Sequence, residues 1–295
     1  MLSPSRTENW RPVTKVLQAG ANGVFCFPVM PKKNPRVRVT PTTYPRMAQW
    51  TGVHYTMLSV TIAACGVFIV AARRIRGTTK ETFYRQMTGW VMLVLGTAWT
   101  IVSLDPSQFD IRESLPLHLC DILRPVLALG LITGNEHALT LTYYWGIILN
   151  PQAIITPDVI YYFDPRWLRF ATYWFFHITA LAIPLALTFG LGYRPTWKGY
   201  RFAVGVTPVW MASVMAVNAR TDGNYGFLNH APGSPSIINL LGPWPWYILA
   251  EIGAVASAWA AMTWPWETRR LRRGTVAAGA KGLLRRSVRA VANRL

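Results

Sequence analysis

The chain has 295 residues, of which 52% are hydrophobic and 14% are charged, and its mean hydropathy is +0.22. An ordinary soluble domain has about a quarter charged residues, so the composition excludes that class. The net charge of +18 would suit nucleic acid, but the basic residues lie in the tails and between apolar runs, as in membrane proteins. We therefore predict membrane lipids as partners and no nucleic acid.

The N-terminal residues 1–46 are polar, basic and rich in proline. Such a segment buries too little apolar surface to offset its conformational entropy, and it has no apolar signal-peptide stretch. We predict a disordered tail that the membrane domain does not need. Met47 directly precedes the first apolar run and is an alternative start.

Apolar runs follow through the rest of the chain. A helix needs about 20 residues to span the hydrocarbon core of a bilayer. The runs lie at residues 54–72, 89–104, 117–133, 138–152, 168–190, 201–217 and 244–264. They predict an all-α fold, a polytopic membrane helix bundle of about seven transmembrane helices within residues 47–265. The fourth run is interrupted by Asn150-Pro151, which leaves a broken or re-entrant piece, and hence six helices, as an alternative.

The C-terminal residues 266–295 form a second basic tail, and the segment from 265 onward holds nine Lys or Arg. Leu284, Val288, Val291 and Leu295 fall on one helical stripe, which favours a helix on anionic lipid headgroups. A solvated tail is the alternative. Because loops 73–85 and 194–198 are also basic, the positive-inside rule places these regions in the cytoplasm and the other loops outside. We predict a protein of the cell (plasma) membrane with a cytoplasmic C-terminus.

The stretch "LPLHLCDILRP", residues 115–125, places four polar side chains at the start of the third run. Pro116 suits the first turn of a helix, which puts Cys120 about one turn inside. A helix N-terminus and a cation one turn away both favour a thiolate. The side chains are His118, Cys120, Asp121 and Arg124. We interpret Cys120 as a nucleophile, with a small buried cysteine as the alternative.

Two further stretches lie on the same predicted outer side. "NPQAIITPD" places Gln152, Thr156 and Asp158 in a loop, and the fifth run carries His177 in an apolar helix. Ionisable residues inside membrane helices are rare and mostly functional. Ordinary loop signals and a histidine satisfied by one hydrogen bond are the alternatives.

A long loop rich in Gly, Asn and Pro, residues 218–249, is the fourth polar stretch. Long loops are often functional, although a structured cap over the bundle would explain this one as well. Its candidate supporting residues are Asn218, Asn224 and Tyr225, together with the polar groups Thr221, Asp222 and His230.

The four stretches converge on one membrane face, which predicts an outward-facing pocket with a Cys120–His177 nucleophile and base. Three functions remain open. A lipid acyltransferase or lipid-ester hydrolase would use the pair covalently, without a cofactor. A small transporter would line a path with the polar groups. A metal site is the third alternative, although the spacing H-x-C alone is not typical of zinc, and we predict no metal.

These residues also resemble a known family. "LPLHLCD", "NPQAIITPD", His177, "DGNYGFLNHAPGSPSIINLLGPWPWY" and "TGVHYTML" with His54 are similar to the YwaF/TMEM164-like integral membrane proteins. The resemblance implies a six- or seven-helix membrane fold. Its mammalian branch implies transfer of a polyunsaturated acyl chain to ether lysophospholipids, with Cys120 and His177 as the catalytic pair. The related androgen-induced-protein group implies lipid-ester hydrolysis with Thr and His instead.

Overall fold

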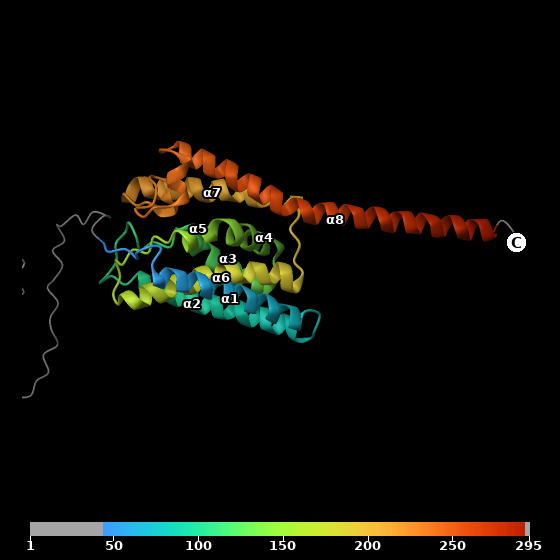
Figure 1. Cartoon of the computed structure of the whole chain (residues 1–295), viewed down its shortest axis with the longest axis horizontal. Coiled ribbons are helices and arrows are strands. Elements are labelled where there is room, and N and C mark those ends of the chain that lie inside the picture. The colour runs from blue at the N-terminus through green and yellow to red at the C-terminus, as the bar shows by residue number, and fades with distance from the viewer. Residues whose placement is uncertain (1–43, 293–295) are drawn as a thin grey trace, which may run out of the picture. The chain divides into compact units, whose positions relative to one another are not determined.

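The computed structural model describes the backbone of residues 44–292 and the side chains of residues 44–271 (Figure 1). Within these residues the structure is helical, and its β structure is one isolated bridge between Arg46 and Ile160. The described residues belong to a structural unit that runs from Pro41 to Leu295. The all-α fold class is thereby confirmed.

The observed helices follow the predicted apolar runs closely. The first two runs form α1 (Gly52–Ile75) and α2 (Lys80–Ser103), and the third forms α3 (Leu119–Thr133). The fifth continues from α6 (Arg166–Leu185) into a π-helical segment, η3 (Ala186–Leu191). The sixth and seventh correspond to α7 (Trp197–Thr221) and the start of α8 (Trp246–Ala292).

The fourth run is helical across the predicted interruption. It comprises α4 (Glu136–Tyr144), the π-helical η2 (Trp145–Leu149) and α5 (Asn150–Ile155). Pro151 lies in the first turn of α5, where its missing N–H matters little, and the wider turn before it accommodates the ring. The irregular chain begins only at Thr156, so Gln152 projects from a helix and not from a loop.

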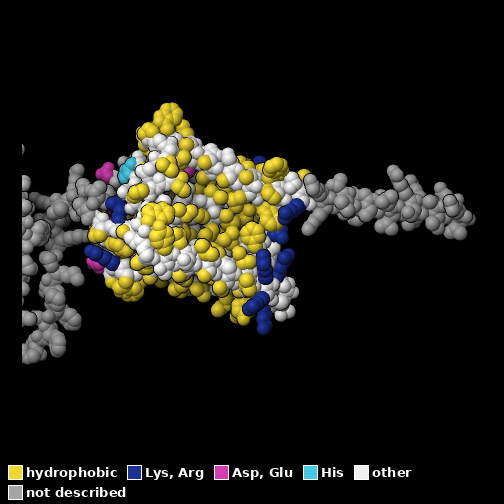
Figure 2. Space-filling model, in the orientation of Figure 1, with side chains coloured by type: hydrophobic (Ala, Val, Ile, Leu, Met, Phe, Trp, Pro, Cys, Tyr) yellow, Lys and Arg dark blue, Asp and Glu magenta, His cyan; other side chains and the backbone are white. Residues whose placement is uncertain are grey.

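Three helices in the described part are long and apolar enough to cross a membrane: α1, the continuous α6–η3 helix and α7. The α6–η3 helix is mostly buried inside the protein, whereas α1 and α7 are mostly exposed. Their exposed side chains are apolar; Ile62 and Val209 are 74% and 66% exposed. Figure 2 shows hydrophobic side chains over much of the visible face. An apolar surface of this kind is favourable in contact with lipid chains and unfavourable in contact with water. Seven crossings stay a prediction.

Small residues let the inner helices approach each other closely, as is common in membrane bundles. A Cβ added at Gly146 in η2 would lie 2.5 Å from the carbonyl oxygen of Ala180 in α6. At Gly190 it would meet Ala72 of α1. The stretch before Asn150 is therefore packed directly on the helix that carries His177.

The connections gather at two ends of the bundle. We call one the motif end; it holds residues 104–118, 156–165 and 222–245, which hydrogen bond to one another. Gln108 Nε2 donates to the carbonyl oxygen of Asp164 at 3.1 Å, and Ser234 Oγ donates to Asp158 Oδ1 at 2.7 Å. The opposite, basic end includes Arg73, Arg76, Arg85 and Arg194, and Figure 2 shows a cluster of basic side chains there.

Residues 44–46 lie within the predicted tail but contact the motif end. Arg46 Nε is 2.9 Å from Asp158 Oδ1, and Tyr44 Oη donates to Asp110 Oδ2 at 3.3 Å. A chain that started at Met47 would lose both contacts. Residues 1–43 lie outside the described residues. The predicted C-terminal tail is helical to Ala292 as part of α8, but its side chains beyond Leu271 are also outside them.

Candidate functional site

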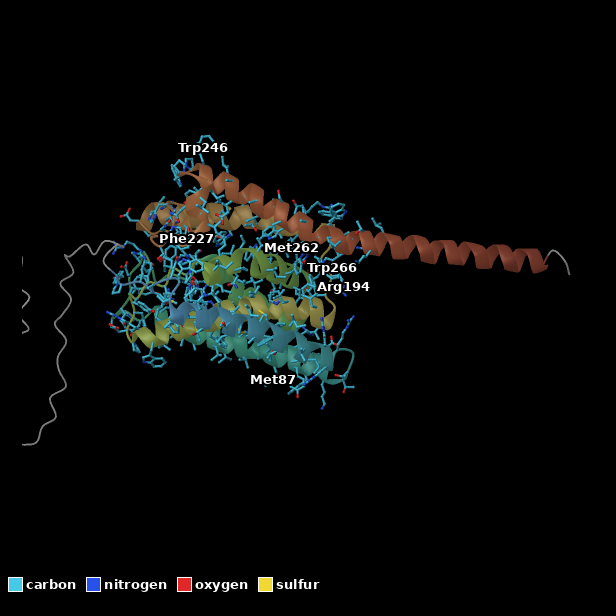
Figure 3. The ribbon with its side chains drawn as sticks, in the orientation of Figure 1. Met87, Arg194, Phe227, Trp246, Met262 and Trp266 are labelled. Carbon is cyan, nitrogen blue, oxygen red and sulfur yellow. The ribbon has the colours of Figure 1, made fainter. Side chains whose placement is uncertain are left out.

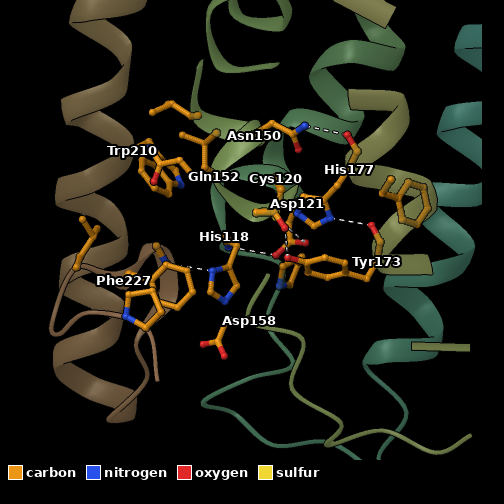
Figure 4. Close-up of a pocket in the computed structure, with 18 of the residues that line it drawn as sticks. His118, Cys120, Asp121, Asn150, Gln152, Asp158, Tyr173, His177, Trp210 and Phe227 are labelled. Atoms are coloured by element: carbon orange, nitrogen blue, oxygen red, sulfur yellow. Dashed lines mark hydrogen bonds between the residues drawn. The ribbon is translucent and has the colours of Figure 1, made fainter. Parts of the chain in front are cut away.

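A cavity of about 250 Å³ lies among α3, α5, α6, α7, α8 and the motif-end segments. This volume is close to the lower end of small-molecule sites, which span about 300–1,000 Å³. All four polar stretches contribute to it. Of the ten predicted catalytic and supporting residues it brings together seven, several of which Figure 4 labels: His118, Cys120, Asp121, Arg124, Gln152, Asp158 and His177. Thr156 of the second polar stretch also lines it.

The first turn of α3 presents the thiol. The helix begins at Leu119 with His118 as its N-cap, so the predicted start at Pro116 was wrong. Cys120 is thus the second helical residue and lies closer to the N-terminus than expected. Asp121 Oδ2 accepts from the N–H of His118 at 3.1 Å, which satisfies one of the unpaired donors at the helix start.

His118 itself is fixed by the long loop. Its Nδ1 accepts from the N–H of Gly226 at 3.3 Å, so the neutral ring carries its hydrogen on Nε2. The ring also packs against the rings of Tyr225 and Phe227, with centroid distances of 5.4 and 5.5 Å. His118 therefore connects α3 to the loop that closes the pocket.

Arg124 lies one turn deeper in α3 and is 8% exposed. Its Nη2 forms an ion pair with Asp121 Oδ1, and its guanidinium carbon lies 4.7 Å from the centre of the Phe176 ring. Arg124 lines the same cavity as Cys120 and His177. The sequence predicted a cation directed at the thiol; in the structure much of that charge is balanced by Asp121.

His177 is 6% exposed on α6. Its Nδ1 lies 2.7 Å from the carbonyl oxygen of Tyr173, and the two ring centroids are 4.1 Å apart. A carbonyl can only accept, so Nδ1 carries the hydrogen and Nε2 holds a lone pair. The backbone of its own helix therefore orients the ring, whereas the side chains of Asp158, Gln152 and Asn224 bond elsewhere.

The segment α5 adds two amide side chains. Asn150 Nδ2 donates to the carbonyl oxygen of His177 at 2.8 Å, and Gln152 Nε2 donates to Glu251 Oε1 of α8 at 3.3 Å. Both residues line the cavity (Figure 4). Asn150 thus connects the fourth predicted run to His177, and Gln152 connects it to α8.

Three predicted supporting residues shape the loop and do not line the cavity. Asn218, 1% exposed, donates through Nδ2 to the carbonyl oxygen of Tyr225 at 2.9 Å and accepts from its N–H at 3.0 Å. Tyr225 Oη accepts from Leu115 N at 2.9 Å and donates to the Ile111 carbonyl oxygen at 2.7 Å. Asn224 bonds to His230, so the loop is a structured cap.

Sequence reasoning missed several lining residues: Glu113, Asn150, Arg169, Tyr173 and Glu251. Glu251 carried a visible signal, because it is an ionisable residue inside an apolar run. Asn150 was read only as a helix breaker. Glu113 was counted only as loop charge, but partial burial raises its pKa to about 7 against the opposing charge of Arg169.

No group of three or more His, Cys, Asp or Glu side chains that could hold a metal ion occurs within the described residues. His230, a polar group of the long loop, bonds to Asn224 and the carbonyl oxygen of Ala231. His54 is fully buried at a second location, where Nδ1 accepts from Trp50 N and Nε2 lies 3.0 Å from the Ile154 carbonyl oxygen. Its role is to join α1 to α5.

Apolar helices around a polar cavity at one end of the bundle are typical of a helical membrane protein. The sequence profile of the TMEM164 family matches residues 49–263, and the chain belongs to this family. The match covers every side chain of the pocket and ends before the basic tail. No curated protein and no solved structure matches the chain.

Proposed function

We propose that this TMEM164-family membrane protein transfers or hydrolyses the acyl group of a lipid ester, with Cys120 as nucleophile and His177 as base. The observation that carries the proposal is that thiol and imidazole line one cavity, with His177 Nε2 as the basic nitrogen. A cysteine and a histidine are a recognised nucleophile and base. The position of Cys120 in the first turn of α3 also favours a thiolate.

In the first half-reaction the thiol proton passes from Cys120 to His177 Nε2. The sulfur then bonds to the carbonyl carbon of the lipid ester, whose π electrons move to oxygen. Collapse of this intermediate breaks the ester C–O bond, and the leaving oxygen takes the proton back from His177. The product is a thioester on Cys120.

In the second half-reaction an alcohol or water gives its proton to His177 and attacks the thioester, and the released sulfur is reprotonated. An alcohol acceptor makes the protein a transferase, and water makes it a hydrolase. Met211, Ile248, Ile252 and Val255 of α7 and α8 line the same cavity and suit an acyl chain. Apolar walls also limit the access of water to the thioester.

The placement in the membrane is part of the proposal. Seven crossings would put the motif end outside and the basic end in the cytoplasm of the cell, in agreement with the positive-inside rule. The pocket would then open to the outer leaflet of the plasma membrane. The basic C-terminal residues 266–295 would bind anionic lipid headgroups on the inner side.

The experiment is covalent labelling of the full chain in lipid nanodiscs with an alkyl-chain chloroacetamide, followed by mapping of the modified residue. Cys120→Ala should abolish labelling and lipid turnover, whereas Cys65→Ala, in the free cysteine of α1, should retain both. His177→Ala should slow turnover by orders of magnitude while lipid still binds. Turnover at the wild-type rate by Cys120→Ala would end the nucleophile assignment, whereas the absence of any lipid turnover by the wild type would favour a transporter.

A further inference from the structure

Two buried polar atoms beside the reactive groups make no hydrogen bond within the described part of the protein. They are Arg124 Nη1 and Asn150 Oδ1, on residues that are 8% and 3% exposed. Both residues line the cavity that holds Cys120 and His177. A neighbouring atom of each group is paired, because Arg124 Nη2 forms an ion pair with Asp121 and Asn150 Nδ2 donates to the carbonyl oxygen of His177.

An unsatisfied buried polar atom is costly, about 1–3 kcal/mol and more for a charged group. Such atoms in a pocket point to a ligand that completes their hydrogen bonds. Their polarity is opposite, because a guanidinium nitrogen can only donate and an amide oxygen can only accept. The missing ligand must therefore present an acceptor to Arg124 and a donor to Asn150.

We propose that Arg124 Nη1 binds the carbonyl oxygen of the acyl group and that Asn150 Oδ1 binds the hydroxyl of the acyl acceptor. This inference rests on the proposed function and names Arg124 and Asn150 as catalytic residues of that same site. A lipid ester and an alcohol supply the two groups that the unpaired atoms require.

The carbonyl assignment follows from the position of Arg124. Arg124 lies one turn after Cys120 in α3 and lines the same cavity as Cys120 and His177. Its guanidinium carbon lies 4.7 Å from the ring centre of Phe176, the residue before His177. When sulfur adds to the carbonyl carbon, the π electrons become a negative charge on oxygen. A fixed donor at that oxygen is worth more in the transition state than in the ground state.

The hydroxyl assignment follows from the bond between Asn150 and His177. Because Nδ2 holds the His177 carbonyl oxygen at 2.8 Å, the amide plane is fixed relative to the helix that carries the base. An alcohol that donates to Asn150 Oδ1 is bound next to His177. The hydroxyl then rotates, so that its hydrogen leaves Asn150 Oδ1 and passes to His177 Nε2 as its oxygen attacks the thioester. Asp121 fixes Arg124 in the same manner through their ion pair.

The test uses the full chain in nanodiscs, a p-nitrophenyl ester of a medium-chain fatty acid as donor and a long-chain alcohol as acceptor. Arg124→Lys keeps a cation that can pair with Asp121, so the fold should persist. Lysine has no second nitrogen, so the donor to the carbonyl oxygen is lost. We expect Cys120 acylation to fall about 10²–10³-fold, the usual effect of losing one oxyanion donor. Arg74→Lys makes the same change at an exposed arginine of α1, is the charge-matched control and should leave the rate unchanged.

A trifluoromethyl ketone with the same chain separates oxyanion binding from general structural damage. The sulfur of Cys120 adds to the carbonyl carbon of the ketone, and the adduct carries a negative charge on oxygen, as the transition state of acylation does. Its affinity should fall in Arg124→Lys by the same factor as kcat/KM, whereas the affinity for the uncharged alcohol should not change. Equal affinity for the ketone in wild type and variant would overturn the assignment.

Asn150→Ala tests the hydroxyl site. We expect acylation by the nitrophenyl ester to persist, since its leaving group needs no proton, and the KM of the acceptor alcohol to rise about tenfold. An equal loss in acylation and transfer would mean that Asn150 only supports His177, and would overturn its role. If wild type forms no thioester on Cys120, the proposed function fails. If the wild type forms the thioester and Arg124→Lys forms it at the same rate, only the present inference fails.

Discussion

The bonds between Asn218 and Tyr225 make the long loop of the motif end testable. Asn218→Ala removes the one side chain that satisfies both backbone groups of Tyr225, at 2.9 and 3.0 Å. Tyr225 is fully buried, and its hydroxyl holds the α2–α3 connection through Leu115 and Ile111. The substitution should therefore release the segment that contacts His118.

The size of the effect follows from the two orphaned groups. Each buried backbone donor or acceptor that loses its partner costs about 1–3 kcal/mol, so the loop should lose about 2–5 kcal/mol of local stability. Every 1.4 kcal/mol is tenfold in an equilibrium constant, so the population of the open loop should rise by about 30-fold or more. Asn218→Asp keeps the acceptor and loses the donor, and should lie between alanine and wild type.

The assay is hydrogen exchange at the Tyr225 amide together with limited proteolysis of residues 222–245, both in nanodiscs. Asn229→Ala is the control, because that side chain is exposed and makes one hydrogen bond, to the Gly223 carbonyl oxygen. If Asn218→Ala exchanges and is cleaved at the same rate as Asn229→Ala, the two bonds do not hold the loop.

Three other predictions concern packing, pH and topology. Gly146→Ala should destabilise the bundle by about 1–3 kcal/mol, because its Cβ would lie 2.5 Å from the Ala180 carbonyl oxygen. Gly66→Ala, with open space around the added Cβ, is the control and should be neutral or slightly stabilising. The thermal midpoints of the two variants in detergent measure the difference. The pKa of Glu113 is about 7 in the folded state against 4.5 unfolded, so its stabilising contribution is complete below pH 4.5 and is lost as the pH rises to 7. The free energy of unfolding of Glu113→Gln should therefore rise by about 1–3 kcal/mol relative to wild type as the pH increases from 5 to 8. A difference in thermal midpoint between variant and wild type that does not change with pH would contradict the raised pKa of Glu113. Reporter fusions at Leu295 should be active in the cytoplasm, and activity of a periplasmic reporter there would reverse the proposed orientation.

The positions of the helices could be predicted from the sequence because long runs of apolar residues are typical of helices that are surrounded by lipid or by other helices. The π-helical segments could not, since they depend on how η2 and η3 pack against their neighbours. The fourth run shows the difference. Asn150-Pro151 was interpreted as an interruption, but the helix passes through it and places Gln152 on a helical face.

The members of the site could be predicted in part. Seven of the ten candidate residues line the cavity, because their segments share one end of the bundle. Their partners were not predictable, since Arg124 with Asp121 and Arg46 with Asp158 are pairings that depend on side-chain geometry. The other three candidates are polar for another reason, because their side chains hydrogen bond to backbone groups of the motif end. They are Asn218, Asn224 and Tyr225.

The close contact between Gly146 and Ala180 has a consequence for how the site meets its ligand. It fixes η2 against α6, and the bond from Asn150 to the His177 carbonyl oxygen continues that contact toward the pocket (Figure 4). Phe227, which lines the same pocket, is labelled in Figure 3. The imidazole of His177 and the amide of Asn150 therefore belong to one closely packed element. Under the proposed function, both groups are in place before the lipid binds. Preorganisation of this kind spares the ligand the entropy of arranging the reacting groups. We expect tolerance for different acyl chains to arise at α7 and α8, whereas changes beneath Asn150 alter the rate for every chain alike.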